Sequence, residues 1–146
     1  MVRPKHTTTW DGEPISPDPP FGAAVIVYRF GQDSVEFLIL HRSIEGPDYE
    51  GDWAWTPPSG ARFPGEGIDD CATRELREET GLELTPRRTR FGSEDWPVYA
   101  AEAKAVDRVQ LGVEHDRCEW VTAQDAVRRC LPEEVGRPFW PMWESL

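Results

Sequence analysis

The sequence predicts an α/β fold in a single domain, and three observations point to it. At 146 residues the chain has the length of one ordinary domain, with enough material for one hydrophobic core. Several short runs are rich in β-branched and aromatic residues and are separated by turn residues, as strands are. One central segment instead repeats its apolar residues every four positions, as a helix does. Strands on both sides of a helix indicate the α/β class.

The first 20 residues are distinct from the rest of the chain. They carry five prolines among polar residues, which favours an extended arm without a helix or a central strand. Trp10 offers this arm a contact with the core. We therefore divide the chain into an N-terminal arm, residues 1–20, and one domain, residues 21–146.

The sheet is expected to begin directly after the arm. Residues 23–30 and 35–42 predict two strands, and the segment 31–34 between them has the composition of a turn. A loop rich in glycine, proline and aspartate then leads to a short predicted strand, 53–56. The sequence Pro-Pro-Ser-Gly at 57–60 is expected to interrupt regular structure before the helix.

Residues 68–80 predict a helix with signals at both ends. Ile68, Ala72 and Leu76 follow one another at four-residue steps, and two aspartates occupy the first turn. Gly81 stands where a left-handed residue ends a helix.

The last third of the chain predicts two more strands and a second helix. The strands are expected at 98–106 and 117–121. Thr122 followed by Asp125 is typical of a helix N-terminus, so a helix is expected over 123–131, and Pro132 is expected to end it. The tail that follows carries three large aromatic residues and is expected to pack back onto the domain.

Charge and cysteine content exclude several classes of protein. The 27 acidic and 16 basic residues give a formal net charge of −11, so the surface repels nucleic-acid phosphates. No apolar run is long enough for a membrane span, and the N-terminus lacks a secretory h-region. The three cysteines form no CxxC motif, which argues against a structural zinc site, and an odd number cannot form a complete set of internal disulfides. We expect a cytoplasmic protein that binds neither nucleic acid nor membrane.

The predicted helix carries a cluster of carboxylates. Glu75, Glu78 and Glu79 stand at i, i+3 and i+4, which places them on one face. Like charges at this spacing oppose a helix by about 0.2–0.5 kcal/mol per pair unless something binds them. A solvated acidic face is one explanation, and a site for divalent cations is the other.

The surroundings of these carboxylates favour the cation site. Residues 60–82 read GARFPGEGIDDCATRELREETGL. This segment resembles the signature of the Nudix hydrolases, GX5EX7REUXEEXGU with U aliphatic, at all nine defined positions in 23 residues. The resemblance implies an α/β/α sandwich around a mixed β-sheet and a hydrolase that cleaves X–P–O–P links.

The resemblance also implies a metal site. Mg²⁺ or Mn²⁺ would be held by the carboxylates of Glu75, Glu78 and Glu79 and by the carbonyl of Gly60, because hard cations prefer oxygen ligands. Arg74 is expected to orient one of these carboxylates.

The expected reaction is attack of an activated water on phosphorus. Glu75 is the first candidate for the general base, and Glu114 is a rival or an additional metal ligand. The predicted catalytic set is therefore Arg74, Glu75, Glu78 and Glu114.

Three local sequences resemble one branch of the family, the asymmetric diadenosine tetraphosphate hydrolases. They are EFLIL at 36–40, WTPPSG at 55–60, and the glutamate-histidine pair at 114–115 with Trp120 five residues on. Ser59 departs from the branch, which has a lysine there. A dinucleoside polyphosphate such as diadenosine tetraphosphate is the substrate that these sequences favour.

Arg42, Trp55 and Tyr99 are the candidate substrate-binding residues. Arg42 stands at a strand end and suits a phosphate, although a solvated strand end explains it as well. The aromatic rings suit a stacked base. Core packing is the alternative for each of them.

Other functions remain open at this point. Ser93, Trp96 and Pro97 resemble fragments of ADP-ribose and NADH pyrophosphatases, and a nucleoside triphosphate is another possible substrate. A non-catalytic nucleotide sensor is the alternative outside enzymes, but its usual sign, altered box carboxylates, is absent here. The oligomeric state is not predicted.

Overall fold

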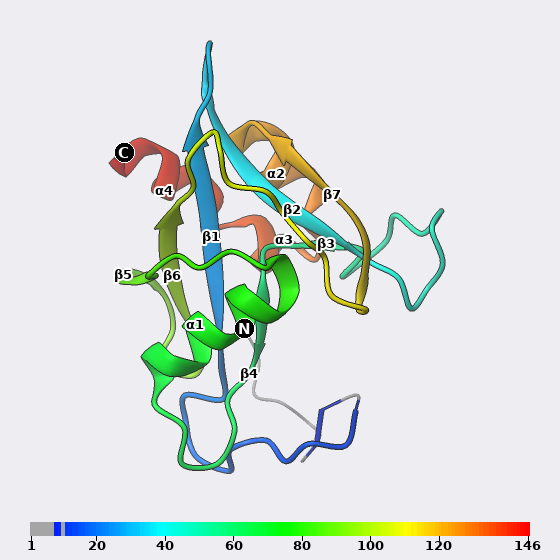
Figure 1. Cartoon of the computed structure of the whole chain (residues 1–146), viewed down its shortest axis with the longest axis vertical. Coiled ribbons are helices and arrows are strands. Elements are labelled where there is room, and N and C mark those ends of the chain that lie inside the picture. The colour runs from blue at the N-terminus through cyan, green and yellow to red at the C-terminus, as the bar shows by residue number, and fades with distance from the viewer. Residues whose placement is uncertain (1–7, 10) are drawn as a thin grey trace.

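A mixed β-sheet of seven strands forms the centre of the computed structural model, which describes residues 8–9 and 11–146 (Figure 1). Its strands are β1 (Gly22–Phe30), β2 (Val35–Arg42), β3 (Trp55–Thr56), β4 (Ser59–Ala61), β5 (Arg87–Gly92), β6 (Pro97–Glu102) and β7 (His115–Val121).

The sheet has the order β3-β2-β1-β6-β5, with β4 paired to β1 and β7 paired to β2. Strands β1 and β6 run parallel, and the other pairs are antiparallel. The sheet is therefore mixed, as the sequence resemblance implied.

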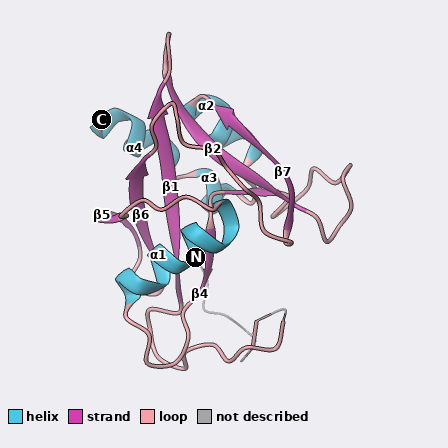
Figure 2. Ribbon diagram, viewed as in Figure 1, coloured by secondary structure: helices cyan, strands magenta, loops and turns pink. Residues whose placement is uncertain are grey.

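Four helices cover the two faces of this sheet: α1 (Ile68–Thr80), α2 (Ala123–Arg129), α3 (Glu133–Gly136) and α4 (Phe139–Ser145). Helix α1 lies on one face, and the other three helices lie on the opposite face (Figure 2). The predicted α/β/α sandwich is confirmed.

Strand β1 is apolar almost throughout because it is buried on both faces. Ala23, Val25 and Val27 pack with Leu76 of α1, whereas Ile26 and its even-numbered neighbours pack with α2 to α4. Successive side chains of a strand point to opposite faces, so one strand serves two cores.

The helix predictions hold where local signals are strongest. Helix α1 occupies 68–80 as predicted, and Gly81 has φ 71° with its N–H bonded to the Arg77 carbonyl. Thr122 accepts a hydrogen bond from the Asp125 N–H and caps α2. This helix ends at Arg129, two residues before the predicted end.

Several strand predictions were wrong. Segment 57–60, expected to lack regular structure, contains the start of β4, because the chain turns back onto β1 after the two prolines. The arginine-rich stretch at 87–90, for which the sequence predicted no strand, belongs to the edge strand β5. The strand predicted over 98–106 ends at Glu102, and the one predicted at 53–56 begins only at Trp55.

The described part of the N-terminal segment and the C-terminal tail differ in their contacts. Thr8 and Pro14 form an isolated bridge, and the contact predicted for Trp10 falls outside the described residues. The tail packs back through the buried Phe139 and Met142, as predicted. Within residues 8–9 and 11–146, every helix is too short or too polar to cross a membrane.

Candidate active site

Helix α1 separates its three glutamates by burial. Glu75 and Glu79 are 8% and 6% exposed and face β4, whereas the Glu78 side chain is 56% exposed. Each helical residue turns the direction by about 100°, so Glu79 lies about 40° to one side of Glu75 and Glu78 about 60° to the other. The three glutamates therefore share one side of α1, as predicted, and Nη1 of Arg74 donates to both Glu75 and Glu78. What separates them is burial, since only Glu75 and Glu79 are covered.

Strand β4 passes directly over the Glu75 carboxyl group. A Cβ atom on Gly60 would lie 2.1 Å from Cδ of Glu75 and within 2.3 Å of both its oxygens. Only glycine leaves this space open. The first glycine of the motif is thus required by the position of the buried carboxylate.

Arg74 ties the loop after β4 to the helix. Its Nε and Nη2 donate to the two carboxylate oxygens of Glu66 at 2.7 and 2.9 Å, and Nη2 also donates to the Ala61 carbonyl at 2.9 Å. Its Nη1 donates to Oε1 of Glu75 at 2.9 Å. The guanidinium lies 3.9 Å from the ring centre of Phe63. Arg74 therefore orients Glu75, as expected, by fixing it to the loop.

Burial and neighbouring charges shift the pKa values of Glu75 and Glu79. Burial raises the pKa of Glu75 to about 7 despite the opposing Arg74, and the nearby Glu78 and Glu114 add to the rise. Burial and the charge of Glu75 raise the pKa of Glu79 well above its usual value, although the Ser59 N–H donates to it at 3.0 Å. Two buried acids that resist ionisation form a site that a cation would stabilise.

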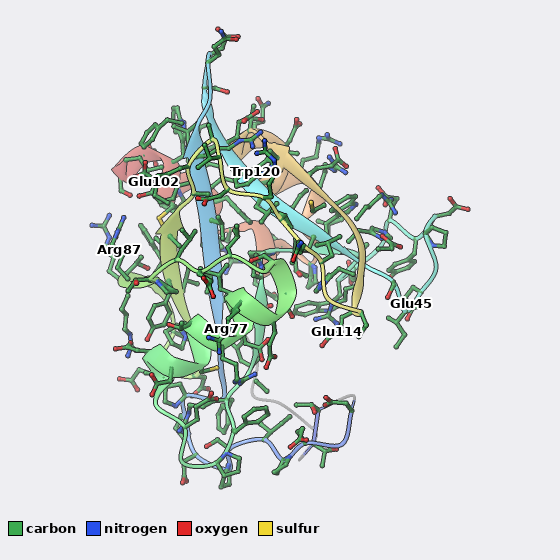
Figure 3. All side chains as sticks on the ribbon, in the orientation of Figure 1. Glu45, Arg77, Arg87, Glu102, Glu114 and Trp120 are labelled. Atoms are coloured by element: carbon green, nitrogen blue, oxygen red, sulfur yellow. The ribbon has the colours of Figure 1, made fainter. Side chains whose placement is uncertain are left out.

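Glu114 reaches this site because its loop is anchored to the end of α1. The Gln110 N–H donates to the Thr80 carbonyl at 2.7 Å, so the loop satisfies a carbonyl that the helix leaves unpaired. A Cβ on Gly112 would lie 2.7 Å from the Glu78 carbonyl oxygen, so the loop lies close against the helix. Figure 1 shows this yellow segment passing beside the C-terminal end of α1, and Figure 3 labels Glu114 at the end of the segment. The sequence signal for this contact was the glycine two residues before Glu114.

Arg42 and His115 pair across β2 and β7 beside the acids. Burial and the charge of Arg42 lower the pKa of His115 to about 4, so this imidazole is neutral at physiological pH. The charge of Arg42 also acts on Glu79, opposing the rise of its pKa. The structure therefore places Arg42 beside the acids, and its contact with a substrate phosphate stays a prediction.

Trp55 and Tyr99 are not part of this site. Each residue is 1% exposed. The Trp55 ring packs 4.4 Å from the Arg129 guanidinium, and the Tyr99 hydroxyl donates to Asp69. Neither ring has a face open for stacking on a base, so we correct both assignments to core packing.

A small cavity lies on the other side of β4. It measures about 50 Å³ and is lined by Trp53, Trp96 and Ser59, among others. Ser59 connects this cavity with the acidic site, because it lines the cavity while its backbone N–H donates to the Glu79 carboxylate. Trp53 has φ 67°, an uncommon conformation for a bulky residue. Nothing in the local sequence indicates a left-handed tryptophan at this position.

The acids fit a hard divalent cation. Within residues 8–9 and 11–146, no three histidine, cysteine or acidic side chains converge on one point. Magnesium does not require such a cage, because it keeps several waters and binds one or two carboxylates together with substrate phosphates. Glu75 and Glu79 supply two buried carboxylates, and the positive charge of Arg74 and Arg42 is not enough to offset the rise of their pKa values. A bound cation would supply the missing positive charge.

We expect the metal-free protein to lose stability as the pH rises from about 4.5 to about 7. Glu75 has its pKa raised from 4.5 to about 7, so the folded state binds more protons than the unfolded state in this window. The stabilisation from the protonated acid is complete below this window and is lost as Glu75 ionises. Glu75→Gln should flatten the dependence of the melting temperature on pH.

Thermal unfolding in chelator at several pH values measures this effect. Glu94→Gln, which changes an exposed acid, is the matched control. Identical slopes for the wild type and Glu75→Gln would contradict the raised pKa.

Comparisons with known proteins show the family to which this chain belongs. A family model described as the NUDIX domain matches residues 18–142. The asymmetrical bis(5'-nucleosyl)-tetraphosphatase of Caenorhabditis elegans is 29% identical over 126 residues, which cover 78% of this chain and 87% of that protein. An isopentenyl-diphosphate Delta-isomerase of Mycolicibacterium vanbaalenii is 30% identical over 129 residues, covering 87% of this chain and 65% of that protein.

Solved structures show the same architecture. The C. elegans Ap4A hydrolase in a binary complex superposes with a TM-score of 0.65 at 26% identity, covering 86% of this chain and 98% of that one. A NUDIX hydrolase from Listeria monocytogenes gives a TM-score of 0.69 at 20% identity, covering 86% and 92%. The matched domain spans most of the chain and contains the complete glutamate motif, so this protein is an enzyme of the Nudix hydrolase family.

Proposed function

We propose that the protein hydrolyses a phosphoanhydride bond of a nucleotide substrate with the help of Mg²⁺ or Mn²⁺. The observation that carries this proposal is the pair of buried acids, Glu75 and Glu79, whose charges are not neutralised by the single contact from Arg74. We further propose a dinucleoside polyphosphate, such as diadenosine tetraphosphate, as the substrate. The similarity to tetraphosphatases supports this choice.

The residues of the site divide the work between them. Glu75 and Glu79 would hold the cation, which would lower the pKa of a water and neutralise charge on the leaving phosphate. Arg74 and the Ser59 N–H fix the orientations of these two carboxylates. Arg42 supplies positive charge beside Glu79 for a substrate phosphate.

Two carboxylates are candidates for the general base. In the metal-free protein the pKa of Glu75 is raised to about 7, and a cation bound to this carboxylate would lower that pKa. Glu75 would therefore act as the base only through an oxygen that does not hold the cation. Glu114 lies close enough to raise the pKa values of Glu75 and Glu79, and its loop brings it from outside the motif. Both remain in the proposed catalytic set.

The cavity beside Ser59 supports an aromatic group in the substrate. Trp53 and Trp96 line it, and indole rings stack well on nucleobases. A cavity of about 150 Å³ is needed to enclose a benzene ring. At about 50 Å³, this cavity must widen to admit a purine, or the base must lie across its mouth.

A substrate panel tests the proposal. Dinucleoside polyphosphates, nucleoside triphosphates, ADP-ribose, NADH and isopentenyl diphosphate would be incubated with Mg²⁺ or Mn²⁺, and the products separated by chromatography. We expect a dinucleoside polyphosphate to give the highest kcat/KM. Glu79→Gln, purified in parallel, controls for contaminating phosphatases.

Other results would redirect the proposal. Faster cleavage of a triphosphate, ADP-ribose or NADH would keep the chemistry and overturn the substrate. Isomerisation of isopentenyl diphosphate would overturn the reaction. Nucleotide binding without turnover of any compound would indicate a sensor. We expect cytoplasmic localisation, which microscopy of a tagged protein would check.

Glu114→Gln is expected to lower kcat/KM by about 10- to 100-fold, in line with other losses around metal sites. The reason is that Glu114 brings a third negative charge to the two buried acids. Steady-state kinetics at saturating Mg²⁺ measure the effect. Glu45→Gln, an exposed acid on the loop after β2, is the control. An unchanged rate for Glu114→Gln would confine the chemistry to α1.

A further inference from the structure

Arg62 makes an unusual set of hydrogen bonds next to the motif loop. Its Nε donates to the Pro20 carbonyl at 2.6 Å, and its Nη1 donates to the Glu66 carbonyl at 2.7 Å. Its Nη2 donates to the Ser16 hydroxyl at 2.9 Å and to the Asp18 carbonyl at 3.0 Å. All four acceptors are uncharged oxygens. These contacts depend on the planar geometry of the guanidinium and not on pairing with an acid.

The backbone reinforces the same contact. The Ser16 N–H donates to the Arg62 carbonyl at 2.7 Å, and the Arg62 N–H donates to the Phe21 carbonyl at 2.8 Å. In Figure 1 the blue N-terminal segment and the green loop after β4 run side by side below the sheet. Residues 16–21 therefore form one unit with the loop.

A short chain of bonds connects this unit to the buried acids. Arg62 holds the backbone of Glu66, and the Glu66 carboxylate binds Arg74 through both oxygens. Arg74 in turn donates to Glu75. A change in the loop at Glu66 would thus alter the position of a proposed metal ligand.

We propose that Arg62 is a positioning residue for metal binding. Residues 16–20 supply acceptors that hold the Arg62 guanidinium in the loop after β4. The N-terminal segment then helps to position the loop after β4, although the sequence predicted a separate arm. The inference rests on the proposed function in one respect, the assignment of Glu75 to the metal.

The test measures Mn²⁺ binding by electron paramagnetic resonance, together with the Mn²⁺ dependence of activity. Arg62→Lys keeps the charge but loses the forked donors, and Ser16→Ala removes one acceptor. Arg128→Lys, on a residue whose side chain is 68% exposed, is the control. We expect Arg62→Lys to weaken Mn²⁺ binding by about 10-fold or more. Ser16→Ala should act in the same direction to a smaller extent, and kcat should recover at saturating metal.

The outcomes are separable. A lower melting temperature with unchanged Mn²⁺ affinity in both site variants would show that Arg62 only stabilises the fold, and it would overturn the inference. If Arg62→Lys does not fold, an unchanged Mn²⁺ affinity in Ser16→Ala is by itself enough to overturn the inference. A wild type that binds no Mn²⁺ would instead overturn the proposed function.

Discussion

Glu79→Gln is expected to lower kcat by about 10²- to 10³-fold, because a bound cation supplies several kcal/mol to the transition state and each 1.4 kcal/mol is tenfold in rate. The same variant should be more stable than the wild type in the absence of metal. Burial raises the pKa of Glu79 well above its usual value, so the wild type bears the cost of a buried charge when this acid ionises. Glutamine keeps the shape and can still accept from the Ser59 N–H.

The opposite signs of these two effects make the prediction specific. Steady-state kinetics at saturating Mg²⁺ and thermal unfolding in chelator at pH 8 measure them. Glu78→Gln is an informative comparison, because the Glu78 side chain is 56% exposed and should show a smaller gain in stability. A Glu79→Gln variant that keeps wild-type kcat would remove Glu79 from the metal site.

The elements that the sequence predicted correctly are those whose signals are local. Helix α1 has an apolar repeat and a glycine stop within its own residues, so its two ends follow from the sequence. The edge strand β5 has no such signal. Three of its arginines are exposed, and only pairing with β6 makes it a strand. Strand β4 was missed because its pairing with β1 outweighs the two prolines before it.

The candidate site, like the fold, was predictable only where its signals are local in the sequence. The spacing along α1 indicated a cluster of acids, but only tertiary contacts decide that Glu79 is buried and Glu78 exposed. The role of Glu114 rested on a resemblance, and its position depends on a loop that binds the end of α1. Trp55 matched a motif and yet lies in the core, because a motif does not report which face of a short strand is covered.

Gly60→Ala tests the close approach of β4 to the helix. A methyl group at this position would lie 2.1 Å from Cδ of Glu75, far inside van der Waals contact. Arg74 holds the carboxylate from the other side, so Glu75 cannot simply rotate away without losing that bond. We expect kcat/KM to fall by about 100-fold or more, because displacement of a catalytic group by about 1 Å has an effect of this size.

Gly46→Ala is the control for the loss of a glycine. Gly46 has φ 94° and no atom within 4 Å of an added Cβ, so alanine there brings backbone strain without a clash. It should lower the melting temperature with little effect on kcat/KM. For Gly60→Ala we expect Mn²⁺ affinity to fall together with activity, since the clash acts on the Glu75 carboxylate itself. Wild-type activity in Gly60→Ala would mean that Glu75 can leave its position under β4, and that its buried position is not required for catalysis.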